Sequence, residues 1–298
     1  MRLTKFLFFL TSLSLLSSLV ILMLSGCSKK EEKSTASSKY DQLVQDIVAA
    51  RQAKTTLPLP TKILGEIQTD EAYQIQLALA KELSKRLGAI VGYKVAYASR
   101  AAQQQFGVSE PACGPFFKNQ RVPSGSALPA NDFIELLMET EIAFTVGKKI
   151  DSKIEDVQEL KTYIKWVHAA FDLGDNRFAI SEGNPTVSDR VATGTGAHVF
   201  VIGPAVDPNR VDVDATTLKL IQNRKIIRES PATEVMGSPW NSMLWLANHV
   251  VESGGVLEAG DVVLTGTAAP AFKAKGESAK GFYEGDCGAL GKVSLTIE

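Results

Sequence analysis

The sequence predicts an α+β fold in which a mixed β-core follows a small helical region. Short β-like runs begin at Ala89 and continue to the C-terminus, and Gly, Pro, Asn and Asp separate them. Helical patterns are few in this part, so the regular strand–helix alternation of a βαβ fold is missing. Before Ala89, apolar residues recur at helical spacing instead. These observations place helices over residues 40–88 and a β-rich domain over residues 89–298.

The first residues have the pattern of an export signal. Arg2 and Lys5 form a short positive region, an apolar stretch follows, and it ends in the residues LSGC at Cys27. Small residues before a cysteine are typical of a bacterial lipobox, so residues 1–26 are predicted to be a lipoprotein signal peptide and Cys27 the lipidation site. A transmembrane signal anchor is the alternative, because the apolar run is nearly long enough to span a bilayer.

Residues 27–39 are expected to form a flexible tether, because the stretch SKKEEKSTASS has almost no apolar side chain to bury. Either interpretation of the leader places the rest of the chain outside the cytoplasm. Ser28 stands where inner-membrane retention is associated with Asp, which favours lipid anchoring to the outer membrane, facing the periplasm. The remaining cysteines, Cys113 and Cys287, could form a disulfide in an oxidising compartment or stay as two buried free thiols.

Local patterns predict the helices and strands. The residues from Tyr40 to Lys54 carry an apolar stripe at helical spacing, and Thr69 is a candidate N-cap for the amphipathic helix that follows. Two longer helices are expected further along, over residues 155–170 and over residues 239–253, the second with Pro in its first turn. The predicted strands have the sequences AIVGYKVAY, EIAFTV, HVFVIG, TLKLI, DVVLTG and KVSLTI.

The composition excludes several classes of function. A formal net charge of −1 and a pI of about 6.4 give no sign of the basic face that nucleic-acid binding needs. The three cysteines and three histidines lack CxxC and HxxxH spacing, which argues against a zinc site. A metal would therefore sit on carboxylate oxygens, which favours Mg²⁺, Mn²⁺ or Ca²⁺. No GxSxG or GxxxxGK[ST] motif is present, and GTG at residues 194–196 precedes a strand, so a Rossmann interpretation fails.

Three acidic residues lie in unusual surroundings. Alternate residues of a strand point to the same face, so Glu139 and Glu141 in METEIAF would stand side by side. Close carboxylates repel each other, and a divalent cation between them removes the conflict, although both could instead lie in water on an exposed strand edge. Asp172 interrupts the apolar run AAFDL at the end of a helical pattern, where it could bind a metal or cap the helix.

Lys94 raises a similar question, because it lies within the β-like run GYKVAY. A partly buried lysine has a lowered pKa and can donate or accept a proton near neutral pH, which makes Lys94 a candidate catalytic residue. The alternative is a lysine on an edge strand, where its charge discourages aggregation between sheets.

These segments together resemble the fumarylacetoacetate hydrolase superfamily, in particular its 2-keto-4-pentenoate hydratase branch. The resemblance covers about residues 90–298 and, more loosely, the helical region. The matching segments are GYKVAYAS, METEIAF, FDLGDNRF, GSPWNSMLWLANHVVESGGVLEAGDVVLTGT and EGDCGALGKVSLTI. The resemblance implies the family's β-core, a roll or sandwich, and it suggests a homo-oligomer.

The resemblance also implies a metal site, a catalytic lysine and substrate contacts. The implied residues are Glu139, Glu141 and Asp172 for Mg²⁺ or Mn²⁺, Lys94 for catalysis, and Thr267 and Gly237 for substrate binding. The implied substrate is a small 2-oxo or 2-hydroxydienoic acid, whose carboxylate and keto oxygens can both bind the cation.

Two segments depart from the hydratase pattern. The acid of the hydratase segment PDYG is replaced by Ala112 in PACG, and the stretch resembling DTVADNASS is DRVATGTGA, at residues 189–197. Three functions stay open: a hydratase-type lyase, a related decarboxylase or acylpyruvate-type hydrolase, and a non-catalytic envelope lipoprotein that binds a small oxo-acid or a partner. The retained Lys94 favours the two enzymes, whereas the missing acid favours the non-catalytic protein.

Overall fold

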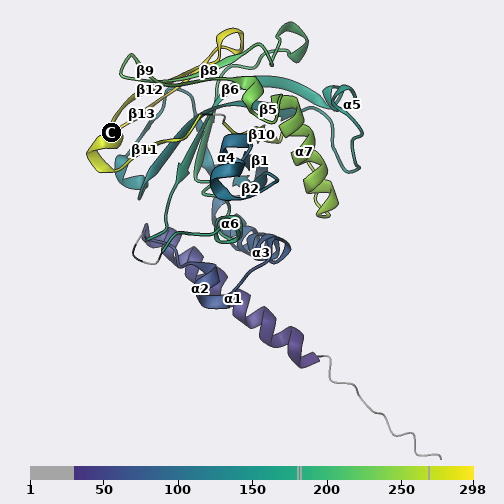
Figure 1. Ribbon diagram of the computed structural model, residues 1–298, viewed down its shortest axis with the longest axis vertical. Coiled ribbons are helices and arrows are strands. Elements are labelled where there is room, and N and C mark those ends of the chain that lie inside the picture. Colours follow the sequence, from purple (N-terminus) through teal and green to yellow (C-terminus); the bar gives the residue numbers. More distant parts are fainter. Residues whose placement is uncertain (1–29, 180, 182, 268) are drawn as a thin grey trace, which may run out of the picture.

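Two β-sheets and a group of helices make up the protein (Figure 1). The computed structural model describes the backbone of residues 30–298 and the side chains from residue 40, except at residues 180, 182 and 268. The predicted signal peptide and Cys27 lie outside the described residues. None of the helices within residues 30–298 combines the length and apolar composition that a membrane crossing requires.

The larger sheet has the strand order β2-β1-β10-β5-β6-β7-β3, and β11 pairs with one end of β5. Its strands are β1 (Ile90–Ala96), β2 (Ala112–Phe117), β3 (Arg121–Pro123), β5 (Leu136–Val146), β6 (Ile164–Asp175), β7 (Val199–Ile202), β10 (Val262–Leu264) and β11 (Phe272–Ala274). The smaller sheet has the order β4-β13-β12-β8-β9. Its strands are β4 (Ala127–Leu128), β8 (Thr217–Gln222), β9 (Lys225–Pro231), β12 (Gly281–Asp286) and β13 (Lys292–Ile297). This mixed arrangement confirms the α+β fold predicted from the sequence.

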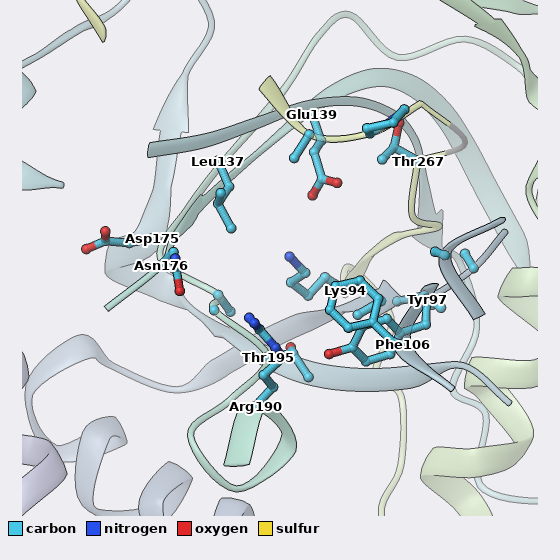
Figure 2. A pocket seen from close by; sticks show the side chains of 18 of the residues that line it. Lys94, Tyr97, Phe106, Leu137, Glu139, Asp175, Asn176, Arg190, Thr195 and Thr267 are labelled. Carbon is cyan, nitrogen blue, oxygen red and sulfur yellow. The ribbon is translucent and has the colours of Figure 1, made fainter. Parts of the chain in front are cut away.

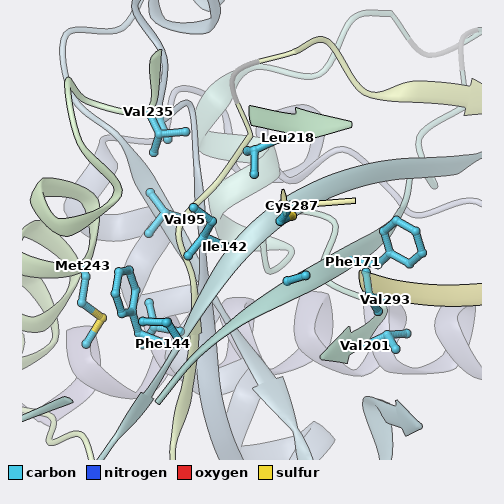
Figure 3. Packing of buried hydrophobic residues seen from close by; sticks show 14 of the residues in the cluster. Val95, Ile142, Phe144, Phe171, Val201, Leu218, Val235, Met243, Cys287 and Val293 are labelled. Carbon is cyan, nitrogen blue, oxygen red and sulfur yellow. The ribbon is translucent and has the colours of Figure 1, made fainter. Parts of the chain in front are cut away.

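The two sheets pack face to face around an apolar core (Figure 3). Ile142 and Phe171 from the larger sheet meet Leu218 and Val293 from the smaller one. At Gly285 the sheets approach so closely that an added Cβ would lie 2.8 Å from the ring of Phe171. Cys113 and Cys287 are both buried free thiols, so the disulfide considered from the sequence is not formed.

Most helices lie at one end of the sheets (Figure 1). They are α1 (Lys30–Ala53), α2 (Pro60–Leu64), α3 (Thr69–Leu87) and α6 (Val187–Ala192), whereas α4 (Arg100–Phe106), α5 (Val157–Lys161) and α7 (Pro239–Glu252) lie beside the larger sheet. The apolar faces of α1 and α3 pack together through residues such as Ile47 and Leu79, as their helical spacing predicts. Thr69 is the first helical residue, and Gln68 is the N-cap.

Helix α1 begins at Lys30, within the segment 27–39 for which the sequence predicts a flexible tether. Helical backbone there continues from the packed part of α1, and Lys and Glu are good helix formers. The role of this segment as a tether stays a prediction.

The helix expected over residues 155–170 is wrong. Only the five residues of α5 are helical, and β6 begins at Ile164 between β5 and β7. A strand in the middle of a sheet is buried on both faces, so its apolar residues run continuously and their periodicity cannot be told from that of a buried helix. Asp172 therefore lies within a central strand and not at a helix end.

Candidate active site

Strands β5 and β6 bring three carboxylates together. Glu139 and Glu141 lie on the same face of β5, as the strand periodicity predicts, and Asp172 stands directly opposite Glu139 on β6. One oxygen from each side chain lies within 4.8 Å of the other two. Glu141 and Asp172 are buried, and Glu139 is half-buried. The three acids form a compact cluster whose members come from two hydrogen-bonded strands.

The cluster is electrostatically unfavourable as three bare anions. Burial raises the pKa of Glu139 to about 7, although Lys94 opposes the shift. Burial, and then the charges of Asp172 and Glu139, raise the pKa of Glu141 well above its ordinary value. The pKa of Asp172 is also raised by burial, against the effect of Lys94. A cation among these oxygens would stabilise their ionised form.

The oxygens of the cluster also suit a hard cation. Glu141 Oε2 accepts a hydrogen bond of 2.7 Å from the Gly266 N–H. Glu141 Oε1 and Asp172 Oδ1 are buried and have no hydrogen-bond partner among the described residues. Buried polar atoms are nearly always satisfied in native proteins, and Mg²⁺ and Mn²⁺ prefer carboxylate oxygens as ligands. The residues present therefore fit a divalent metal ion.

Lys94 completes the cluster from β1. Strand β1 lies between β2 and β10, so the interpretation of Lys94 as an edge-strand lysine is wrong. Its side chain is 6% exposed, and Nζ forms an ion pair with Asp172 Oδ2. Burial acts to lower the pKa of Lys94, as the sequence predicts, but the carboxylates of Asp172, Glu139 and Glu141 outweigh it and raise the pKa above its ordinary value. Lys94 is therefore a buried cation at neutral pH.

The cluster opens into a cavity of about 290 Å³ (Figure 2). Lys94 and the carboxylate of Glu139 point toward each other across it. Thr267, which the family resemblance implies as a substrate contact, lines this cavity, whereas Gly237 is not among the described lining residues. Gly237 instead has a φ of 79° in the turn before α7, where a left-handed conformation favours glycine. The substrate contact implied for Gly237 stays a prediction.

Three arginines also line the cavity, and sequence reasoning did not identify them. Arg177 Nε lies 2.7 Å from Asp175 Oδ2, and both side chains are buried. Arg51 Nη2 donates a hydrogen bond of 2.6 Å to the Thr193 carbonyl, and burial followed by the charge of Arg177 lowers its pKa to about 10. Arg190 lies on α6. Two sequence features could have pointed to these arginines. Arg177 follows Asp175 by two residues near the end of a segment that matches the family, and Arg190 lies in the segment that departs from the hydratase pattern.

The segment of residues 189–197 forms part of the cavity wall. Its first residue, Asp189, is buried and accepts hydrogen bonds of 2.8 Å from the backbone N–H groups of Thr61 and Thr186. These bonds fix the start of α6 and the residues that follow it. Ala112, which replaces the hydratase acid, is buried on β2 and is not among the described lining residues.

The sequence of the chain is similar to those of known proteins. Residues 89–287 match the family model described as fumarylacetoacetate (FAA) hydrolase, C-terminal. A 2-keto-4-pentenoate hydratase of Burkholderia vietnamiensis is 30% identical over 84% of this chain and 93% of the relative, and one of Paraburkholderia phymatum is 29% identical over 87% and 98%.

Solved structures share the fold. The 4-oxalocrotonate decarboxylase from Pseudomonas putida G7, complexed with magnesium and adipate, has a TM-score of 0.80 at 21% identity and covers 88% of this chain and 98% of its own. Fumarylpyruvate hydrolase from Pseudomonas aeruginosa, in complex with Mn²⁺ and pyruvate, has a TM-score of 0.53 at 17% identity and covers 69% and 88%.

Proposed function

The chain belongs to the fumarylacetoacetate hydrolase family, and from this premise we propose that it is a divalent-metal-dependent lyase of the 2-keto-4-pentenoate hydratase type. Its substrate would be a small 2-oxo or 2-hydroxydienoic acid. The observation that carries the proposal is the meeting of Glu139, Glu141 and Asp172 beside Lys94 at a cavity. The names of the relatives and the metal ions in the solved structures support it.

The proposed chemistry divides between the metal site and Lys94. Mg²⁺ or Mn²⁺, held by Glu139, Glu141 and Asp172, would supply a Lewis acid for the carboxylate and keto oxygens of a 2-oxo acid. Lys94 stays charged at neutral pH, so its Nζ donates hydrogen bonds to a substrate oxygen on which negative charge develops. The cavity walls hold the acid in one orientation and limit its contact with water.

A related decarboxylase is the second candidate. It is favoured because the acid that could activate a water molecule in the hydratase pattern is missing here. Ala112 supplies no acid at the cavity, and Asp175, which lines it, is paired with Arg177. Decarboxylation of an oxo-acid requires no added water, whereas hydration requires a group that activates one. A non-catalytic oxo-acid binder would keep the metal site without turnover.

Turnover measurements distinguish these functions. We expect 2-hydroxypenta-2,4-dienoate to be consumed in the presence of Mg²⁺ and not after chelation of the metal. Lys94→Met should lower kcat/KM about 100-fold, because a charged hydrogen-bond donor at the developing negative charge is lost. The matched control is Lys165→Met, at an exposed lysine on β6, which should stay within about twofold of the wild type.

The other outcomes are equally specific. Release of CO₂ from 2-oxohex-3-enedioate, without consumption of the dienoate, would assign the decarboxylase. Metal-dependent binding of oxalate with no turnover of either acid, in the wild type as in Lys94→Met, would contradict both enzymes.

The location of the protein stays a prediction from the sequence. Lipidation of Cys27 would anchor the proposed enzyme to a bacterial membrane through the segment that precedes the folded part. The homo-oligomer suggested by the family resemblance stays a prediction as well.

A further inference from the structure

Arg190 differs from the other arginines of the cavity because its guanidinium has neither a hydrogen bond nor an ion pair with a described residue. Arg51 donates to the carbonyl of Thr193, and Arg177 pairs with Asp175. Each of the three arginines has a buried nitrogen without a hydrogen-bond partner, but for Arg190 no described residue accepts a hydrogen bond from any part of the guanidinium or forms an ion pair with it. Arg190 is half-buried, so its charge is partly removed from water, and a ligand of opposite charge would stabilise it.

Two aromatic rings hold the Arg190 guanidinium in place without using its N–H groups. Its central carbon lies 5.4 Å from the ring centroid of Phe106 and 5.8 Å from that of Phe178. Contacts of this kind stabilise a guanidinium and fix its plane. Its hydrogen-bond donors remain available, and Figure 2 shows the side chain extending into the cavity from the side opposite Glu139.

The backbone that carries Arg190 is also fixed. The adjacent Asp189 is held by Thr61 and Thr186, and Gln76 Nε2 donates a hydrogen bond of 2.8 Å to the Val191 carbonyl. Arg190 is therefore anchored on both sides of its own position. A hydrogen-bonded backbone and a guanidinium in contact with two rings reduce the ordering cost of binding a ligand, as expected of a binding residue.

The charges along the cavity favour a ligand with more than one negative group. Its lining includes Arg51, Lys94, Arg177, Arg190 and Lys273. A divalent ion on the carboxylate cluster would leave this lining with more positive than negative charge. One substrate carboxylate can meet the metal and Lys94, but it leaves Arg190 unpaired on the other side.

We propose that Arg190 binds the distal carboxylate of a dicarboxylic 2-oxo acid. This inference rests on the proposed function, because the 2-oxo acid group must occupy the metal site and Lys94. A guanidinium pairs with a planar carboxylate through two parallel hydrogen bonds, which suits the donors left free on Arg190. A cavity of about 290 Å³ has room for about ten water molecules, a size that fits a small dicarboxylate.

Pairs of acids that differ only at the distal end test this inference. Isothermal titration in the presence of Mg²⁺ would compare 2-oxoglutarate with 2-oxopentanoate, and 2-oxoadipate with 2-oxohexanoate. We expect the wild type to bind the better dicarboxylate 10- to 100-fold more tightly than its monocarboxylic partner, as a charged, bidentate pair allows. Arg190→Gln should remove this preference and change the affinity for the monocarboxylates less than twofold.

Two further variants serve as controls. Arg190→Lys keeps the charge but not the bidentate geometry, so part of the preference should remain. Arg210→Gln removes an arginine whose side chain is 83% exposed and should leave every affinity unchanged. The wild-type pairs decide the question even where a variant fails to fold.

The outcomes separate this inference from the proposed function. The role of Arg190 would be overturned if the wild type bound both members of each pair equally, or if Arg190→Gln weakened the binding of both members equally. Either result would be consistent with a metal-dependent oxo-acid site. Absence of Mg²⁺-dependent binding for all four acids would overturn the proposed function and the inference together.

Discussion

The two walls of the cavity are charged in opposite senses and built in different ways. The carboxylate wall consists of Glu139 and Glu141, with Asp172 buried beside them, and the arginine wall consists of Arg51, Arg177 and Arg190. The first lies on two adjacent strands in continuous register, whereas the second comes from α1, the segment after β6, and α6. The carboxylate wall keeps oxygens without hydrogen-bond partners. Of the three arginines, Arg51 donates to the Thr193 carbonyl and Arg177 pairs with Asp175. One wall is thus prepared for a cation. On the other wall, Arg190 is the arginine without a hydrogen-bond or ion-pair partner among the residues that the structure describes.

Removing the charge of Asp175 tests whether the arginine wall is compensated internally. Asp175→Asn keeps an oxygen for the N–H groups of Ile134 and Glu135, which Oδ1 accepts at 2.9 and 3.0 Å, but leaves Arg177 as an uncompensated buried charge. We expect the free energy of unfolding, measured by urea denaturation, to fall by about 3–5 kcal/mol.

The matched control for this change is Asp151→Asn. Asp151 pairs with Lys149 at 3.1 Å, and both side chains are about half exposed, so the loss should be at most about 1 kcal/mol. Equal losses in the two variants would show that the ion pair of Asp175 with Arg177 does not stabilise the arginine wall.

Glu141→Gln tests the carboxylate wall. The amide oxygen can still accept the Gly266 N–H, but one negative ligand is lost, so we expect Mg²⁺ affinity measured by isothermal titration to fall about 100-fold or more. The melting temperature of the metal-free protein should stay unchanged or rise, because one of three mutually repelling acids is removed.

The exposed Glu229 on β9 provides the control for that experiment, and Glu229→Gln should change neither quantity. Undiminished Mg²⁺ binding by Glu141→Gln would contradict a ligand role for Glu141. A large loss of metal-free stability would instead indicate that Glu141 is mainly structural.

The same contrast explains how much the sequence could predict. The carboxylates of β5 follow from strand periodicity alone, and the α+β fold from the strand-like runs after Ala89. The β6 strand could not be recognised, because its apolar run is buried on both faces and has no distinctive period. The family resemblance implied that Asp172 is a metal ligand, but the strand that carries it was not predicted. The register of β5 and β6 places Asp172 opposite Glu139.

The arginine wall has no comparable local signal. Arg51 and Arg190 lie far apart in the sequence, and only the packing of α1 and α6 against the sheet brings them to one cavity. The lowered pKa expected for Lys94 failed for a related reason. Burial could be inferred from the apolar neighbours of Lys94, but the three carboxylates that reverse its effect come from other strands.

The smallest expected effect separates the two walls by their response to pH. Glu139 has its pKa raised to about 7 in the metal-free protein, so below pH 7 it holds a proton that a metal ion must displace, and above pH 7 it does not. Mg²⁺ affinity should therefore fall about tenfold between pH 8 and pH 6, and more if Glu141 also releases a proton. Arg51, with its pKa of about 10, stays charged over this range. At saturating Mg²⁺, the preference for dicarboxylic over monocarboxylic acids should then stay constant between pH 8 and pH 6. If this preference weakened in parallel with the Mg²⁺ affinity, the two walls would not act independently.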